Sequence, residues 1–308
     1  MPQVLKRFGV FYFAKLYKIS CFIGAGTGIG KGIAFGLAKQ GKKVIAGVET
    51  LSEVSAIKNE AAEKELELRV EKLDIISEAD RERAGDWEID VLVNNAGVSI
   101  GGSLVDIPEE HLRRQYEVNV FGTIFLTQQI VRKMVKKQHG KVIFVSSISG
   151  LMSDPLSGPY GSSKFAIEAF AESLSAELQE FKIQVGTINP GPYLTGFNDR
   201  EFETWRSWRD NPNERIFDYE QLAFPYEQLD PEGVIEEAIK VVTGEVKQYR
   251  NVIPSAMSAL AKKREKELWD KKIDDNLGER HELVQKSMDI DPETSVGKSV
   301  INKIKDLI

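Results

Sequence analysis

Cysteine is nearly absent from this chain, because Cys21 is the only one among 308 residues. A single thiol cannot form an intrachain disulfide, so burial and hydrogen bonding must hold the fold together, as in proteins of reducing compartments. We therefore expect a cytoplasmic protein. Residues 1–18 precede the first expected strand, and we interpret them as a disordered extension or as the product of a start placed too far upstream.

Histidine clusters, long apolar runs and a basic surplus are missing as well. The three histidines are scattered without metal-ligand spacing, so no metal site is expected. No run of about 18 apolar residues occurs, so no membrane span is expected. The formal net charge is -6, which argues against a nucleic-acid partner. No Asp or Glu precedes Glu49, and this basic beginning favours an anionic ligand as much as a solvated surface.

What the sequence does contain is a regular alternation of short apolar segments and helical ones. Short apolar strands separated by helices pair in parallel, with both faces of the sheet covered. The sequence therefore predicts an α/β fold with a doubly wound, Rossmann-like parallel sheet, in a single domain over 19–254 with a charged helical C-terminal extension over 255–308. Strands are expected at 19–23, 44–48, 68–73, 91–93, 142–145 and 183–188, and helices at 29–40, 52–65 with Ser52 as N-cap, 108–135, 158–181 and 231–242.

A glycine-rich turn connects the first expected strand to the first helix. Gly24, Gly28 and Gly30 follow the pattern G-x-x-x-G-x-G. Glycines let the backbone approach a pyrophosphate closely, and a helix N-terminus presents free N–H groups and partial positive charge to it. A tight structural turn has the same composition, so this motif alone is weak.

An acidic residue at the end of the second strand supports a dinucleotide. Such a residue, about 20 positions after the turn, binds the adenosine ribose hydroxyls. Glu49 has this place, and its carboxylate would repel a 2′-phosphate. NAD(H) is therefore favoured, with NADP(H) as the other possibility. An exposed Glu without a ligand fits the pattern too.

Tyr160 and Lys164 share one face of an expected helix, because they lie four residues apart. An ammonium about 5 Å away favours a phenolate by about 3 kcal/mol, or about two pKa units, at an effective dielectric constant of about 20. We therefore expect Tyr160 to exchange a proton with an alcohol or a ketone at neutral pH. Ser147, after the fifth strand, can orient the reacting carbonyl, although Ser–Ser is also common turn chemistry.

Together these residues resemble the short-chain dehydrogenase/reductase family, in its compact branch of about 250 residues, over roughly residues 19–254. Val48 stands where the family usually has Asp, so ribose recognition falls to Glu49. The resemblance implies four catalytic residues, Asn119, Ser147, Tyr160 and Lys164. The cofactor contacts that it implies or supports are Gly24, Thr27, Gly28, Ile29, Gly30, Glu49, Asp74, Asn95, Ala96, Gly97, Tyr160, Lys164, Pro190, Gly191 and Thr195.

By this resemblance the chain is an NAD(P)-dependent oxidoreductase that interconverts a secondary alcohol and a ketone. Tyr160 exchanges the proton, Lys164 lowers its pKa and holds the nicotinamide ribose, Ser147 holds the substrate oxygen, and Asn119 positions a water that links Lys164 to solvent. The resemblance also implies a homodimer or homotetramer built through the helices at 108–135 and 158–181.

The substrate is predicted from the segment 191–226, where the family builds its substrate lid. Nine aromatic residues there favour an apolar small molecule, although aromatic residues also pack cores. Trp269, Ile273 and Leu277, spaced as on one helix face, are expected to pack against the domain or a partner subunit. Two other functions stay open: a cofactor-binding regulator without turnover, and a nucleotide-sugar epimerase or dehydratase relative.

Overall fold

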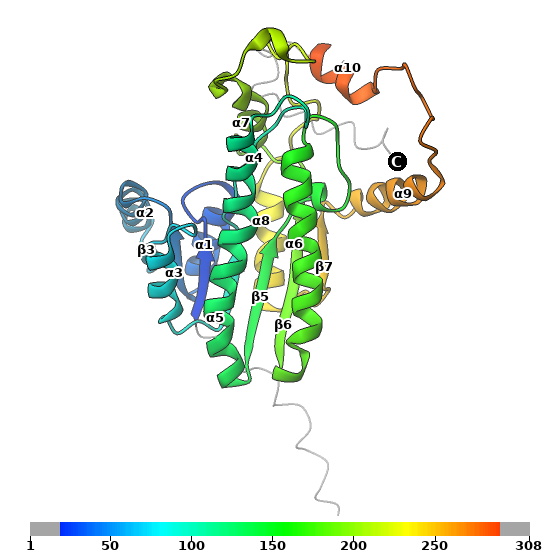
Figure 1. Cartoon of the computed structure of the whole chain (residues 1–308). Coiled ribbons are helices and arrows are strands. Elements are labelled where there is room, and N and C mark those ends of the chain that lie inside the picture. Colours follow the sequence, from blue (N-terminus) through cyan, green and yellow to red (C-terminus); the bar gives the residue numbers. More distant parts are fainter. Residues whose placement is uncertain (1–18, 290–308) are drawn as a thin grey trace, which may run out of the picture.

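A seven-stranded sheet forms the centre of the computed structural model, which describes residues 19–289 (Figure 1). The strand order is β3-β2-β1-β4-β5-β6-β7, and every pairing is parallel. The order reverses between β1 and β4, which is where such sheets open a crevice for ligands. The predicted doubly wound sheet is confirmed. Its strands are β1 (Ile19–Ile23), β2 (Lys43–Val48), β3 (Arg69–Lys72), β4 (Val91–Asn94), β5 (Gly140–Val145), β6 (Ile183–Pro190) and β7 (Arg250–Ile253).

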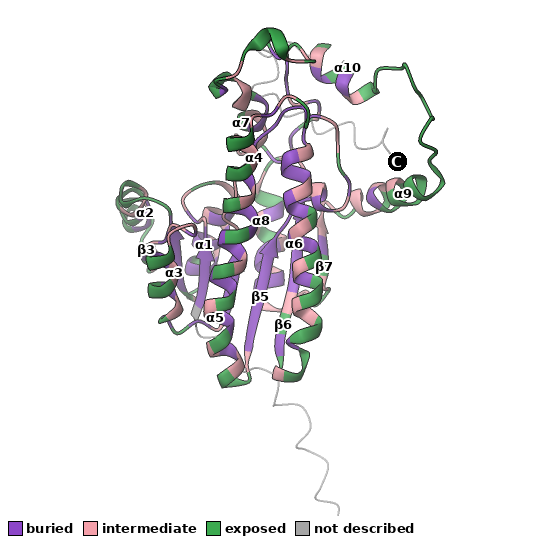
Figure 2. Ribbon diagram, in the orientation of Figure 1, coloured by how far each residue is buried: buried purple, intermediate pink, exposed green. Residues whose placement is uncertain are grey.

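Helices cover both faces of the sheet, and the strands in its centre are almost entirely buried (Figure 2). One hydrophobic cluster joins the sheet to α1 (Gly28–Lys39), α2 (Leu51–Glu63) and α8 (Glu232–Thr243). A second cluster joins the opposite face to α3 (Glu78–Gly85), α5 (Thr123–Lys137) and α6 (Gly158–Glu177). Burial on both faces explains why the strands read as continuous apolar runs.

Several elements differ from the sequence-based expectations. The long helix expected at 108–135 is divided into α4 (Glu109–Tyr116), a π-helical turn (Glu117–Gly122) and α5. The strand β7 and the helix α3 were not anticipated. The N-cap of α2 is Thr50 and not Ser52, because Thr50 and Glu53 form a capping box in which each side chain accepts from the other's backbone N–H.

The lid follows β6 and contains α7 (Phe197–Glu203), with 3₁₀ turns at Thr204–Ser207 and Pro212–Glu214. Its aromatic residues mostly pack against one another. Trp208 and Tyr219 meet edge to face with ring centroids 5.1 Å apart, and Phe202 and Phe224 do so at 5.5 Å. Most of the nine aromatics therefore build a small core of their own.

The C-terminal extension contains α9 (Met257–Asp270) and α10 (Glu282–Asp289). Val284 of α10 joins the aromatic core of the lid, and the backbone of Ala223 donates to the Ser287 carbonyl at 2.9 Å. The extension thus packs on the lid side of the domain (Figure 1). The expected stripe does not pack against the domain, because Trp269 is 84% exposed near the end of α9 and Ile273, just beyond α9, is fully exposed. Its packing against a partner subunit stays a prediction.

The interpretation of residues 1–18 lies outside the described residues, as does that of 290–308. Between residues 19 and 289, none of the helices has the length and apolar character needed to cross a bilayer. Assembly through the helices at 108–135 and 158–181 stays a prediction. Phe121, Phe125 and Phe165 are each more than 40% exposed on these helices.

Candidate active site

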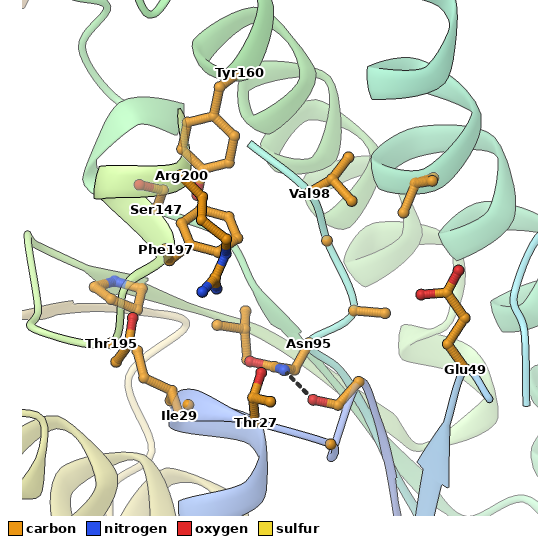
Figure 3. A pocket seen from close by; sticks show the side chains of 18 of the residues that line it. Thr27, Ile29, Glu49, Asn95, Val98, Ser147, Tyr160, Thr195, Phe197 and Arg200 are labelled. Carbon is orange, nitrogen blue, oxygen red and sulfur yellow. Dashed lines mark hydrogen bonds between the residues drawn. The ribbon is translucent and has the colours of Figure 1, made fainter. Parts of the chain in front are cut away.

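One cleft opens at the carboxyl ends of the strands and collects nearly all the residues that the sequence singled out. Figure 3 shows Glu49 and Tyr160 on opposite sides of it, with Asn95 and Thr27 lower down between them and Thr195 at the lower left. Among the expected site residues, Gly30 and Asn119 do not line the cleft and act from behind it. The others that line it are Gly24, Gly28, Ile29, Asp74, Ala96, Gly97, Ser147, Lys164, Pro190 and Gly191.

The glycine-rich turn forms the floor of the cleft. Gly24 and Gly28 have φ of +74° and +55°, a region that residues with a side chain rarely adopt. A methyl group on Gly30 would lie 2.4 Å from the Gly24 carbonyl oxygen, which itself accepts from Asn95 Nδ2 at 2.9 Å. These contacts hold the turn close to the segment that follows β4.

The space above the turn suits a phosphate group. A methyl group on Gly28 would meet only Thr195, at 3.6 Å or more. Thr27 is the N-cap of α1, and its hydroxyl makes no capping hydrogen bond, so it remains available to a ligand. An open glycine surface at a helix N-terminus fits the pyrophosphate of a dinucleotide.

The side of the cleft opposite Tyr160 carries one carboxylate and one cation that face each other. Glu49 Oε1 lies 3.5 Å from Arg114 Nη2, and both residues line the cleft. Glu49 follows β2, whereas Arg114 comes from α4. Sequence reasoning missed Arg114, because nothing in the local sequence shows that α4 ends above β2.

Tyr160 and Lys164 project from the first turns of α6 and are buried. Lys164 Nζ lies 5.6 Å from the centroid of the Tyr160 ring and donates to the Val145 carbonyl at 2.9 Å. Desolvation lowers the pKa of Lys164 to about 8, and the nearby Glu168 carboxylate acts against this. Lys164 is therefore mostly a cation at neutral pH.

The pKa of Tyr160 is shifted upward in this structure, and the expected lowering by Lys164 stays a prediction. Burial raises the pKa of the Tyr160 hydroxyl well above its usual value, and a hydrogen bond with Ser147 acts to lower it without offsetting the burial. The physical reason is that withdrawing a phenolate from water costs more here than the neighbouring groups return. Tyr160 therefore holds its proton at neutral pH in this structure.

Asn119 lies behind the cleft in the π-helical turn. Its Oδ1 accepts from the Val98 N–H at 2.8 Å, and its Nδ2 donates to the Val98 carbonyl at 2.9 Å and to Ser163 Oγ at 3.0 Å. A methyl group on Gly97 would lie 3.3 Å from Asn119 Oδ1 and 3.7 Å from Lys164 Nζ. Asn119 thus fixes the segment beside Lys164. π-Turns are frequent at functional sites, and its role toward a water stays a prediction.

A buried network that sequence reasoning missed holds Ser147 in place. Asn189 on β6 donates to the Ser147 carbonyl at 3.1 Å and to Glu168 Oε1 at 2.6 Å. Glu168 in turn pairs with Arg250 on β7 at 3.0 Å. The unanticipated strand β7 therefore supports the end of β5, where Ser147 stands.

Two further side chains from the lid reach the cleft. Phe197 meets the Tyr160 ring at 5.6 Å between centroids, and Arg200 points its guanidinium into the cleft (Figure 3). Tyr193 and Phe197 are the lid aromatics that line the cleft. In the part of the chain that the structure describes, no group of three or more His, Cys, Asp or Glu side chains could hold a metal.

Comparison with known proteins places these residues in a family context. The family model described as short chain dehydrogenase matches residues 18–206. The chain is 38% identical over 159 residues to an NADPH-dependent 3-dehydrocapnine reductase of Ornithobacterium rhinotracheale. This alignment covers 50% of this chain and 56% of the relative. The chain is 36% identical over 187 residues to a 3-ketodihydrosphingosine reductase of Bacteroides thetaiotaomicron, covering 59% of this chain and 66% of the relative.

The matches therefore span about half to two thirds of these curated relatives. Among solved structures, the fold is similar to a short chain dehydrogenase/reductase of Burkholderia phymatum in complex with NAD. The TM-score is 0.72 at 20% identity, and the alignment covers 87% of this chain and 100% of the other. At this identity the likeness concerns the fold alone.

Proposed function

This chain belongs to the short chain dehydrogenase family, and from this premise we propose that it is a nicotinamide-dependent oxidoreductase that reduces a ketone to a secondary alcohol. The observation that carries the proposal is the meeting of Ser147, Tyr160 and Lys164 in the cleft whose floor is the glycine-rich turn. A dinucleotide lying along this floor would bring its reactive end to Tyr160. The reverse oxidation uses the same residues.

The chain's own residues supply orientation and the proton. When bound, the nicotinamide donates the hydride in reduction or accepts it in oxidation. Ser147 and Tyr160 would both hydrogen-bond the substrate oxygen, and Tyr160 gives its proton to that oxygen as negative charge develops on it. Because burial raises the pKa of Tyr160, the protonated form that ketone reduction needs is the one present at neutral pH. Lys164, cationic below a pKa of about 8, stabilises the phenolate left behind.

We propose NAD(H) as the favoured cofactor, on the basis of Glu49. Replacing Glu49 with Gln is expected to raise the affinity for NADP(H) relative to NAD(H) by about tenfold, because it removes a carboxylate that repels a 2′-phosphate and releases Arg114 to pair with it. Fluorescence titrations of the two reduced cofactors measure this ratio.

The double variant Glu49→Gln/Arg114→Met serves as the control and is expected to lose that gain. An unchanged ratio in Glu49→Gln, or a wild-type protein that already prefers NADP(H), would contradict the assignment of Glu49.

We further propose an apolar substrate. Tyr193 and Phe197 present aromatic rings to the cleft, and Leu104, 64% exposed, packs beside Gly158 at the beginning of α6, two residues from Tyr160. The two curated relatives carry names of reductases acting on 3-dehydrocapnine and 3-ketodihydrosphingosine. These observations favour a ketone attached to a long apolar group.

The test is binding followed by turnover. NADH and NADPH are first titrated into the purified protein, and their absorbance is then followed with a panel of ketones of increasing chain length. We expect one cofactor to bind and at least one apolar ketone to be reduced. Cofactor binding without turnover of any ketone or alcohol would favour the regulator instead, and failure of both cofactors to bind would overturn the proposal.

A further inference from the structure

Arg200 on the lid helix α7 is a cation that the reaction described above does not use. It follows Gly196, which has φ of +71° and brings the chain from Thr195 into the helix. A methyl group on Gly196 would lie 3.1 Å from Arg200 Nη1, so the guanidinium folds back over the beginning of the lid. Figure 3 shows the guanidinium below Phe197, pointing toward Thr27 and Asn95.

The lid that carries Arg200 begins beside the glycine-rich turn. Thr195, at the base of the lid, lies 3.6 Å from where a methyl group on Gly28 would be, so the lid base and the turn are neighbours. Both Arg200 and the turn line the cleft. The lid thus holds a cation on the open side of the surface that suits a phosphate.

The charges around the cleft leave Arg200 available. Across residues 19–289, no carboxylate lies within the 4.0 Å of an ion pair with Arg200. The two other cations that line the cleft are engaged, Arg114 with Glu49 and Lys164 with the Val145 carbonyl. Near the turn stands a carboxylate, since a methyl group on Gly26 would lie 2.6 Å from Glu53 Oε1. Because this carboxylate repels an anion bound at the turn, such an anion needs a positive charge on its other side, which is the side of the lid.

We propose that Arg200 binds the pyrophosphate of the dinucleotide from the lid side, so that the anion lies between the glycine-rich turn and α7. This inference rests on the proposed function and adds to it a specific residue for cofactor binding. A planar guanidinium can donate two parallel hydrogen bonds to phosphate oxygens. Because Phe197 on the same helix touches Tyr160, cofactor binding would also fix the lid over the reacting centre.

Binding measurements on the full chain test this proposal without relying on turnover. ADP-ribose, which contains the pyrophosphate, and adenosine, which lacks it, are titrated into wild type, Arg200→Met, Arg200→Lys and Arg206→Met by calorimetry. Arg206 is exposed on the same lid, packs on Trp205 and does not line the cleft, so it is the matched control. Thermal melts of all four proteins show whether they are folded.

We expect Arg200→Met to weaken ADP-ribose by about 10- to 100-fold, the range of a charged hydrogen bond, and to leave adenosine unchanged. Its affinity for ADP-ribose is expected to depend less on salt than that of wild type, because one screened attraction is gone. Arg200→Lys is expected to fall between the two, and Arg206→Met to match wild type.

Two results distinguish a failure of the proposed function from a failure of the assignment of Arg200. If wild type binds neither ADP-ribose nor NADH, the proposed function itself is wrong. If wild type binds both and Arg200→Met binds ADP-ribose with the same affinity and salt dependence, only the assignment of Arg200 is overturned. The same holds if the only change in that variant is a raised KM for anionic ketones, which would place a substrate anion at Arg200.

Discussion

Replacing Tyr160 with Phe is expected to lower kcat for ketone reduction by about 10²- to 10⁴-fold, the usual contribution of a positioned acid. The ring of Tyr160 packs on Phe197 and under Lys164 Nζ, and a Phe ring keeps both contacts. The dissociation constant of the reduced cofactor is therefore expected to stay within about threefold of wild type. Steady-state kinetics and fluorescence titration of the same preparation measure the two quantities.

Tyr116→Phe is the matched control for this prediction. Tyr116 is half-buried at the end of α4 and does not line the cleft, so loss of its hydroxyl is expected to leave kcat unchanged. A Tyr160→Phe variant that keeps more than about a tenth of the wild-type kcat would remove Tyr160 from its role as proton donor.

Glu201 gives the second large effect, on stability. It is 3% exposed on α7, and burial raises its pKa to about 7, while the hydroxyls of Ser99 and Ser157 act to lower it. Below pH 4.5 both the folded and the unfolded chain hold this proton. Between pH 4.5 and 7 the unfolded chain releases it first, so the free energy of unfolding falls as pH rises. Above pH 7 the full penalty, about 3 kcal/mol, is present.

Glu201→Gln is therefore expected to be more stable than wild type at pH 8, by up to about 3 kcal/mol, and similar to it near pH 4.5. Urea unfolding at a series of pH values measures the difference between the two proteins. Glu203→Gln, exposed on the same helix, is the control and is expected to show no such dependence. A stability difference between the two proteins that stays the same at every pH would mean that the pKa of Glu201 does not change on folding, and this would contradict the prediction.

The parts of the site that could be predicted from the sequence are local. Gly24, Gly28 and Gly30 lie in one turn, and Tyr160 and Lys164 lie one turn apart on one helix, so spacing alone brings each set together. The alternation of buried strands and helices likewise fixes the sheet, because both faces are covered.

The parts that could not be predicted depend on contacts between distant segments. Arg114 meets Glu49 only because α4 ends above β2, and Arg200 reaches the cleft only because the lid folds back over it. The strand β7 has four residues at the edge of the sheet, too few for a clear periodicity. Burial of Tyr160 reverses a pKa shift that a charge at helical spacing alone would predict.

Transfer of an isotopic label tests most directly the central claim that this cleft carries out ketone reduction. The protein is incubated with an apolar ketone from the panel and with reduced nicotinamide cofactor deuterated at C4, each of the two C4 epimers in turn. With one epimer, mass spectrometry is expected to find one deuterium on the carbinol carbon of the alcohol, and with the other none. Alcohol formed without the label from either epimer would contradict the account.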